Sequence, residues 1–415
     1  MRYSAKERLI AKLLTSFPKL KLLVKYIYQR INFLIHKKKY VFKTDLKIEK
    51  ISTPNSKHTF FGYYDRSPMS NDGKKVIFHS TSFNTHQEPN KCQEIDIMLY
   101  DINSSKTSKI STTNAFNWQQ GAKLQWLNND EFIFNDYIKE KNQYVSKIYS
   151  LTSKKLRQID TPIYDVHDKY ALSLNFDRLT KLRPDYGYFS KTDLGQKFDY
   201  SNEGIVYVDL IQNNFYLLLS IDEIIQSHYH QSMDEAEHLV NHIMISPNGN
   251  SFMFLHRWFN NGVRKDALMI CDKNGKNLKC LADNDMVSHC FWKNSNEIIG
   301  YMRGVSKEDR YYSIDISDNK IHILDKLNGY GDGHPHINEH LLITDTYPNK
   351  SRMKELLLYD FNSNELRSIG EFYEPFNYYG QTRCDLHPRI SFDKKYFFID
   401  SVHDGERHLY MIHND

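Results

Sequence analysis

Four histidines, His242, His289, His334 and His387, recur at intervals of about 45 to 54 residues, and each leads into a short strand-like segment. A repeat of this length is typical of one four-stranded blade of a β-propeller. Residues at the same register of successive blades meet around one central channel. The spacing therefore predicts a propeller in which these four imidazoles converge.

Together with three earlier units, the four histidine units make seven repeats in the chain. Their anchor residues are Ser67, Trp126, His167, Ser246, Trp292, Ile337 and Ser391. The long step after His167 contains Ile221–Ile225, a stretch that predicts a short helix inserted at a blade edge. Propellers usually close by pairing a strand from one terminus with a blade from the other, and either Asp45–Ile51 or Arg407–Ile412 could supply it. We expect an all-β fold with residues 43–415 forming a seven-bladed β-propeller.

Composition supports a folded β chain and excludes some partners. Apolar residues make up 40% of the sequence, and its 29 Tyr and 24 Phe favour strand faces over helices. The net charge of +4 and the lack of a nucleic-acid motif argue against a nucleic-acid partner. The five cysteines form an odd set without a CxxC pair, which argues against a disulfide framework and a thiolate metal site. Reduced cysteines in a cytoplasmic protein are expected.

Residues 1–42 differ from the rest because most of the positive charge lies there. The first 40 residues contain eleven Lys or Arg and one acidic residue, Glu7. Apolar residues at helical spacing predict two basic amphipathic helices, the first over Leu9–Phe17 and the second beginning near Pro18. One side of the second helix carries Leu20, Leu23, Val24, Ile27, Ile31 and Leu34.

Charges interrupt these helices too often for a membrane span or a signal peptide. Basic helices with an apolar face bind anionic inner-leaflet lipids. We therefore expect a cytoplasmic protein that is peripheral on the inner face of the membrane, with residues 1–40 contacting the anionic surface. The alternative is a helix pair packed on the propeller or on another chain.

The expected channel combines imidazoles, a phenol and cations. Strand side chains alternate, so His336 shares a side with His334 and Arg389 shares one with His387. The same register places Tyr63 and Lys123 at the positions of His242 and His289. Neutral imidazole commonly binds zinc, iron and manganese, so a divalent metal, manganese, iron or zinc, is expected. The predicted ligands are His242, His289, His334, His336 and His387. In the alternative interpretation, each His-Pro pair starts a strand and the ring caps backbone groups.

Further polar residues lie near these histidines in the sequence. A base beside guanidinium groups suits proton abstraction next to a carboxylate. The expected turn after Phe252–Leu255 offers such a set, although surface charges on a hairpin would look the same. The predicted catalytic residues are His256, Arg257, Arg264 and Lys123, and the predicted substrate-binding residues are Tyr63, Arg383 and Arg389. Asp332, Asp345 and Asp385 are candidates for orienting the imidazoles.

Four segments carry a resemblance to the oligogalacturonate lyase family and its TolB-like relatives. They are Glu237–His242 with the Ser-Pro-Asn-Gly that follows, Ser288–Trp292, His334–His336 and His387–Arg389. The resemblance covers roughly residues 55 to 412 and implies a seven-bladed propeller with a divalent metal in its channel. It also implies β-elimination from a uronate, in which the metal and an arginine neutralise the carboxylate and a histidine removes the C5 proton.

Individual positions follow this resemblance only in part. His289, His334 and His336 match the metal-binding histidines of the family best. A glutamine ligand of the family corresponds to Gly331 here, so His242 or His387 would have to supply the missing ligand. The leader has no counterpart among the lyases.

Three functions remain open from the sequence. The first is a metal-dependent, lyase-like enzyme acting on anionic, uronate-containing saccharides. The basic leader favours a second, a membrane-surface glycosyltransferase that uses lipid-linked saccharides to build a capsule, O-antigen or other surface polysaccharide. The third is a non-catalytic interaction scaffold, because propellers host many unrelated functions.

Overall fold

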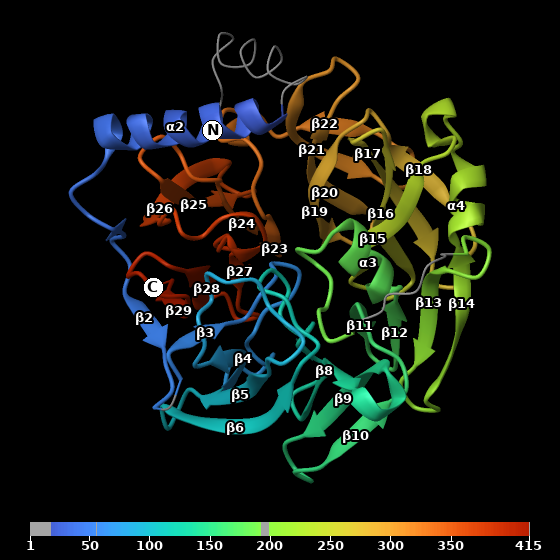
Figure 1. Ribbon diagram of the computed structural model, residues 1–415, viewed down its shortest axis with the longest axis horizontal. Helices are drawn as coiled ribbons and strands as arrows, with labels where there is room; N and C mark the ends of the chain where they lie inside the picture. Colours follow the sequence, from blue (N-terminus) through green and yellow to red (C-terminus); the bar gives the residue numbers. More distant parts are fainter. Residues whose placement is uncertain (1–17, 55, 192–198, 415) are drawn as a thin grey trace.

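The computed structural model describes residues 18–54, 56–191 and 199–414, and its strands form seven antiparallel sheets around a central axis (Figure 1). Blade 1 contains β3 (His58–Phe60), β4 (Lys75–Thr81), β5 (Ile95–Asp101) and β6 (Lys106–Thr113). Blade 2 contains β7 (Gln125–Trp126), β8 (Glu131–Ile138), β9 (Gln143–Ser150) and β10 (Leu156–Ile159). Blade 3 contains β11 (Asp165–His167), β12 (Tyr170–Ser173), β13 (Gly204–Asp209) and β14 (Asn214–Ser220).

The second half of the chain forms the four blades that carry the repeated histidines. Blade 4 contains β15 (Glu237–Ile245), β16 (Ser251–Asn260), β17 (Val263–Asp272) and β18 (Lys279–Ala282). Blade 5 contains β19 (Val287–Asn294), β20 (Glu297–Arg303), β21 (Asp309–Asp315) and β22 (Ile321–Ile323). Blade 6 contains β23 (His336–Asn338), β24 (Leu341–Asp345), β25 (Met353–Asp360) and β26 (Glu365–Tyr373). Blade 7 contains β27 (Arg389–Ile390), β28 (Tyr396–Ser401) and β29 (His408–His413). The predicted seven-bladed propeller is confirmed.

Both segments proposed for ring closure take part in it, and they pair with each other. The N-terminal strand β2 (Ile48–Ile51) pairs antiparallel with the C-terminal β29 and completes blade 7. An additional short strand, β1 (Phe42–Lys43), pairs with β26 and gives blade 6 a fifth strand. The expected boundary between residues 42 and 43 thus falls inside β1.

Helices lie at the periphery of the propeller. They include α2 (Pro18–His36), α3 (Phe176–Leu182) and α4 (Ile221–Ser227), with short 3₁₀ turns at Lys139–Lys141, Gln231–Met233, Asp325–Leu327 and Gly380–Thr382. Helix α4 confirms the helix expected at Ile221–Ile225, and a capping box between Ser220 and Glu223 starts it. Helix α2 confirms the second predicted leader helix, whereas the first lies outside the described residues.

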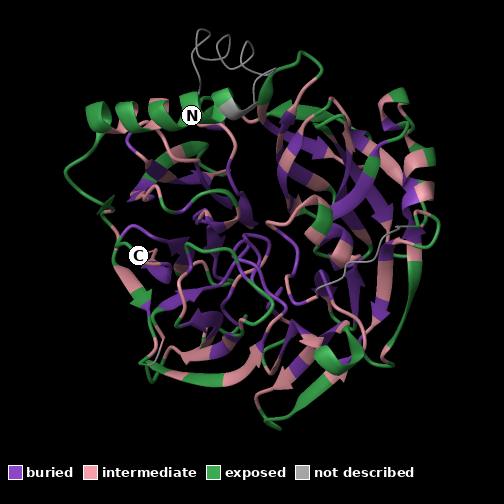
Figure 2. Ribbon diagram, viewed as in Figure 1, coloured by how far each residue is buried: buried purple, intermediate pink, exposed green. Residues whose placement is uncertain are grey.

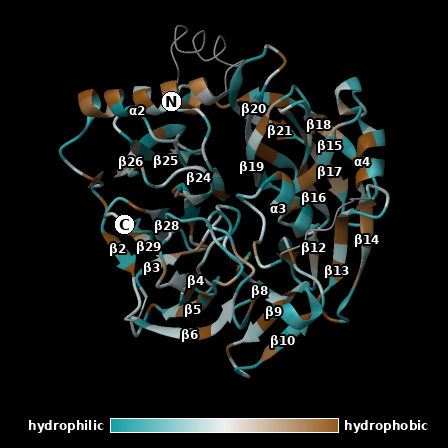
Figure 3. Cartoon of the chain, in the orientation of Figure 1, coloured by the Kyte–Doolittle hydropathy of each residue, from teal (hydrophilic) through white to brown (hydrophobic). Residues whose placement is uncertain are grey.

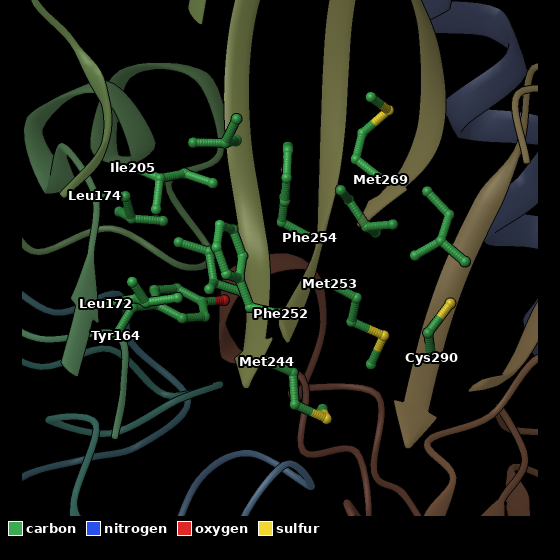
Figure 4. Packing of buried hydrophobic residues seen from close by; sticks show 14 of the residues in the cluster. Tyr164, Leu172, Leu174, Ile205, Met244, Phe252, Met253, Phe254, Met269 and Cys290 are labelled. Atoms are coloured by element: carbon green, nitrogen blue, oxygen red, sulfur yellow. The ribbon is translucent and has the colours of Figure 1, made fainter. Parts of the chain in front are cut away.

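The core lies between adjacent blades because strand side chains alternate between the two faces of each sheet. In β16, Phe252 and Phe254 point toward Leu172 and Ile205 of blade 3, while Met253 points toward blade 5 (Figure 4). All of these side chains are buried. Burial of each large apolar side chain contributes about 1.5 to 3 kcal/mol, so the ring is held by packing around its whole circumference.

Buried carboxylates link blade 7 to blade 1 and blade 3 to blade 4 near the channel. Asp400 of blade 7 accepts hydrogen bonds from the backbone N–H groups of Phe61 and Gly62 at 2.9 and 2.8 Å. Asp165 of blade 3 accepts one from the N–H of Ile245 at 2.7 Å. These bonds satisfy buried carboxylates and amides together, and they fix the backbone where it turns into the channel.

The imidazole of His79 in blade 1 forms a comparable hydrogen bond to the next blade, and it can bind a proton in acid. The backbone N–H of Ala122 in blade 2 donates to His79 Nε2 at 3.1 Å. The neighbouring Gly121 is required, because a Cβ there would lie 2.3 Å from the His79 ring. Burial lowers the pKa of His79 to about 3, so the ring is neutral at physiological pH.

We predict that His79 makes the propeller less stable in mild acid. The unfolded chain binds a proton near pH 6.5 whereas the folded ring resists one until about 3, so stability falls as pH falls through this interval. By pH 4 this one group costs ~3 kcal/mol of unfolding free energy. Urea unfolding of His79→Gln, which retains an acceptor, should show a shallower fall between pH 6.5 and 4. His322→Gln, at an exposed histidine of β22, is the control, and parallel curves for His79→Gln and wild type would contradict the prediction.

Candidate active site

Several residues that enter the channel have a backbone conformation that side chains seldom adopt. His242, His387 and Lys123 have φ angles of 51°, 43° and 51°, in the left-handed region. At His242 the strand pairing of β15 with β16 shifts register between Asn241 and Met244. Such conformations cost of order 1 kcal/mol or more and cluster at functional sites. The fold accepts this cost where side chains turn into the channel.

The structure brings four of the predicted imidazoles together around one phenol. Ring centroids are 4.1 Å apart for His289 and His334, 4.3 Å for His334 and His387, and 5.9 Å for His242 and His289. The Tyr63 ring lies 5.0 Å from His387 and 5.3 Å from His242. Blades 1, 4, 5, 6 and 7 all contribute to this cluster.

Two of these histidines and an aspartate could bind one metal ion. Ligand atoms of His334, Asp385 and His387 all lie within 4.8 Å of one another. The Nε2 atoms of both histidines are buried and have no hydrogen-bond partner among the described residues. Buried polar atoms are rarely left in this state. Two lone pairs and a carboxylate at this spacing fit a small divalent cation.

Asp345 orients both histidines. One carboxylate oxygen accepts hydrogen bonds from the backbone N–H and the Nδ1 of His334, each at 2.8 Å, and the other accepts the backbone N–H of His387 at 3.1 Å. The Nδ1 of His387 contacts the carbonyl oxygen of Gly62 at 2.8 Å. Since both Nδ1 atoms face acceptors, both Nε2 atoms are left as potential ligands.

Charge states at the cluster follow from burial and from this carboxylate. Burial lowers the pKa of His387 well below 6.5, and the neighbouring His334 lowers it further. Burial also lowers the pKa of His334, but the Asp345 carboxylate outweighs it and the net shift is upward. Neutral His387 therefore offers a lone pair, whereas a metal at His334 would displace a proton.

His289 lies beside this group and has its own orienting partner. Its Nδ1 is 3.2 Å from Asp332 Oδ1, and the Ser288 hydroxyl donates to Asp332 Oδ2 at 2.6 Å. Burial raises the pKa of Asp332, but His289 and Ser288 outweigh it, so the carboxyl pKa lies below 3.8. His289 is thus held as a third imidazole next to the candidate metal ligands.

His336 and Arg389 lie in a different layer from the four clustered rings. His336 Nδ1 contacts the carbonyl oxygen of Tyr64 at 2.7 Å, and its ring centroid lies 4.6 Å from that of Phe291. Arg389 is fully buried and donates to the carbonyl of Tyr63 and to Asp400. A strand advances ~3.3 Å per residue, so a residue two positions along lies one layer further down the channel. His336 is therefore not placed with the candidate ligands, and Arg389 holds the backbone of blade 1.

Lys123 also belongs to the interior. Its ammonium lies 2.5 Å from Asp65 Oδ2 and 4.2 Å from the centre of the Tyr164 ring, with both charged side chains buried. A buried pair of this kind neutralises itself and satisfies its own hydrogen bonds. The structure thus gives Lys123 a packing role, in place of the direct catalytic contact expected from the sequence.

His256 does not lie on a turn, because β16 continues to Asn260. Its Nε2 is 3.0 Å from His238 Nδ1 and its Nδ1 is 3.1 Å from His228 Nε2, so both nitrogens face other imidazoles. None of these contacts is with a clustered histidine. Arg264 lies on β17, 40% exposed, and pairs with Asp266. The expectation that these residues reach the channel from a loop is wrong in its structural premise.

Arg257 and His242 form the better candidate for acid–base chemistry. Arg257 is buried and donates to Asn241 at 2.9 Å and to Asp266 at 2.8 Å. Burial lowers the pKa of His242 well below 6.5, and the positive charges of Arg257 and Arg183 reinforce this. His242 retains some exposure, and its Nδ1 is 2.7 Å from the Tyr63 hydroxyl. A neutral, accessible imidazole beside fixed cations can accept a proton.

A segment that sequence reasoning missed provides further charge at the site. Arg183 pairs with Asp185, which also accepts from Arg383 at 3.3 Å. Arg383 additionally binds the candidate ligand Asp385 at 2.7 Å, and its Nη2 lies 3.5 Å from the Tyr186 hydroxyl. Arg383 therefore links Asp385 to Asp185, Arg183 and Tyr186. The Arg-Pro-Asp-Tyr stretch after α3 was the available signal, but it falls in the least regular blade.

A groove of about 890 Å³ lies between α2 and two residues that neighbour the histidine cluster. Asp332, which orients His289, and Tyr347, whose ring lies 5.8 Å from that of His334, line its inner part. Lys25 and Gln29 of α2 line its outer part. The basic lining residues are Lys25, Arg303, Lys307, Arg310 and Arg352, and the acidic ones are Glu308, Asp309 and Asp332. The groove is therefore polar, aromatic and net positive.

Comparison with known proteins identifies the fold but no family. No protein-family model and no curated protein matches the sequence. Among solved structures, an oligogalacturonate lyase in complex with manganese is similar, with a TM-score of 0.62 and 13% identity over 91% of this chain and 95% of that one. The oligogalacturonate lyase of Vibrio parahaemolyticus gives 0.60 and 12% over 90% and 96%. A chain of the mitotic checkpoint complex gives 0.51 and 12% over 92% and 96%. At these identities the likeness establishes the shared propeller fold alone.

We predict that His387 is neutral and carries its proton on Nδ1 at pH 7. The Gly62 carbonyl oxygen can only accept, so the Nδ1 that contacts it must carry the proton, and burial keeps the ring from binding a second one. Long-range ¹H–¹⁵N NMR of ¹⁵N-histidine-labelled, metal-free protein reports the tautomer, and a His387→Asn variant assigns the signal. His322, exposed on β22, is the internal reference. A proton on Nε2 of His387 would remove the proposed lone pair.

Proposed function

We propose that this chain is a metal-dependent enzyme that cleaves anionic, uronate-containing saccharides by β-elimination. The observation that carries this proposal is the pair of unpartnered Nε2 atoms beside Asp385, next to a partly exposed neutral histidine and several arginines. The propeller shared with oligogalacturonate lyases supports it at the level of fold.

The metal would be held by His334, His387 and Asp385, with His289 alongside. Two imidazoles and one carboxylate suit manganese, iron or zinc, and Asp345 and Gly62 fix the rings in the required orientation. When bound, a divalent cation would supply Lewis acidity toward a carboxylate oxygen of the substrate. The donor types and their spacing thus fit the cofactor.

His242 is the proposed base, in place of His256. With its Nδ1–H donated to the Tyr63 oxygen, the Nε2 lone pair is free to take the proton from the carbon next to the carboxylate. The bond between the β-carbon and the leaving oxygen then breaks, a carbon–carbon double bond forms, and the leaving oxygen finally acquires a proton. Arg183 and Arg383 would hold carboxylates of the saccharide, and Tyr186 a hydroxyl.

The groove supports an extended anionic substrate. Its net positive lining and its tyrosines, Tyr301 and Tyr347, suit a chain of uronates, since sugar faces stack on aromatic rings and carboxylates pair with arginine. The inner end reaches the residues that contact His289 and His334, so a bound chain would present one residue to the cluster.

A second candidate is saccharide transfer at a membrane surface. It is favoured by α2, which exposes apolar residues on one side and lines the groove with Lys25 and Gln29 on another, an arrangement suited to a lipid-linked saccharide. Consumption of a sugar nucleotide in the presence of a lipid-linked acceptor, without formation of an unsaturated product, would favour it. Absence of both activities would favour the non-catalytic scaffold.

The lyase proposal predicts an unsaturated product from uronate oligomers. Full-length protein loaded with Mn²⁺ and incubated with oligogalacturonates and other uronate oligosaccharides should generate ultraviolet absorbance from the new double bond. His242→Asn should lower the rate about 10²-fold or more, because general base catalysis contributes that much. Asparagine tolerates the left-handed backbone at this position, so the fold should survive. His322→Asn is the matched control, and no absorbance from any oligomer would refute the elimination.

A separate prediction concerns metal affinity. Asp345→Asn cannot accept all three hydrogen bonds that orient His334 and His387, so Mn²⁺ affinity should fall about 10- to 100-fold. Electron paramagnetic resonance of free Mn²⁺ during titration measures it, with near-ultraviolet circular dichroism to verify folding. Asp385→Asn should weaken binding as well, whereas Asp318→Asn on the surface should not. Equal affinities in all three variants would place the metal elsewhere.

A further inference from the structure

Helix α2 exposes its apolar side, whereas an ordinary surface helix buries it. Seven aliphatic residues on one side form what we name the apolar stripe: Leu20, Leu23, Val24, Ile27, Ile31, Leu34 and Ile35. At about 100° per residue they occupy an arc of about 120°. Every one is exposed, from 36% for Val24 to 70% for Ile35. Figure 2 shows the helix largely exposed and Figure 3 shows its hydrophobic segments.

The other side of α2 packs on the propeller and is more polar. The ring of Phe33 stacks on Tyr373 and packs edge-to-face with Phe376, with ring centroids 5.7 and 5.5 Å apart. Gln29 and Lys25 line the groove. A surface helix normally buries its apolar face against the core. Here the fold fixes the helix by its aromatic and polar side and leaves the apolar stripe facing outward.

Charge indicates what covers the apolar stripe. Residues 18–40 contain seven Lys or Arg and no acidic residue. Lys21, Arg30 and Lys37 are exposed beside the stripe or just after it. A second copy of the chain would bring the same positive charges into contact. An anionic lipid surface would accept the aliphatic side chains and attract the cations together.

No helix among the described residues is long and apolar enough to cross a membrane. We propose that the apolar stripe of α2 docks this protein on an anionic lipid surface, with the helix lying in the plane of the interface. The outer end of the groove, formed by Lys25 and Gln29, then lies next to the lipid headgroups.

Vesicle binding tests this proposal without any substrate. Full-length protein should co-sediment with phosphatidylcholine vesicles containing 30 mol% phosphatidylglycerol, and not with pure phosphatidylcholine. Ile27→Asn/Ile31→Asn should reduce binding at least 10-fold. The helix should stay in place, because Phe33 still packs on Tyr373 and Phe376. Lys21→Gln/Lys37→Gln should reduce it about 30-fold and weaken its salt dependence, because each of the two cations near the surface contributes ~1 kcal/mol.

The matched control is Ile211→Asn, which removes an aliphatic side chain that is 65% exposed in the turn between β13 and β14 of blade 3, and it should bind as wild type does. Binding unaffected by the Ile27/Ile31 change would overturn the proposal. So would self-association that this change abolishes in a protein that ignores vesicles, because a second copy would then cover the stripe. Binding by a variant lacking residues 1–17 but not by the full chain would assign the stripe to that segment instead, and would equally overturn it.

Discussion

The site depends on one buried carboxylate, that of Asp345. It accepts the backbone N–H and the Nδ1 of His334 and the backbone N–H of His387, so a single residue sets the position of two blades and the orientation of a ring. An ionised carboxylate without these donors would be costly to bury, and the donors without the carboxylate would be unsatisfied. This mutual requirement explains how two neighbouring histidines can keep Nε2 atoms that have no hydrogen-bond partner among the described residues of a packed channel.

The same principle recurs around the ring and explains why the channel is polar but ordered. Asp400 and Asp165 fix the backbone of the following blade, and His79 does so with a neutral ring. Hydrophobic packing between blades drives closure, while these bonds select one arrangement of the loops at the axis. The left-handed conformations at His242 and His387 are held by this network, which places their cost where it directs imidazoles inward.

The sequence predicted the parts of this arrangement that follow from period and register. Spacing alone located the blades, the closure strands and the convergence of His242, His289, His334 and His387, because equivalent positions of propeller blades meet at the axis. The sequence did not predict how far along the channel each histidine lies. Alternation placed His336 on the side of His334, but it could not show that His336 lies one layer further along and forms its hydrogen bond with the Tyr64 carbonyl. The prediction that His256 lies on a turn was also wrong. The strand was expected to end with the apolar run at Leu255, but Trp258 and Phe259 continue it.

The position of α2 links the surface of the molecule to its interior. The sequence pattern predicts the aliphatic side of α2 but not which side of the helix is buried. Nothing in the spacing of Phe33 and Gln29 indicates that they contact the propeller. Once Phe33 packs on Tyr373 and Phe376, the orientation of the apolar stripe and the wall of the groove are fixed together. In the function proposed above, a saccharide in that groove would lie between Lys25 of α2 and Asp332, which orients His289. The position of α2 therefore connects the two proposals. If the apolar stripe docks on a lipid surface, the groove opens beside that surface, where it could bind an anionic saccharide attached to or lying near the lipid.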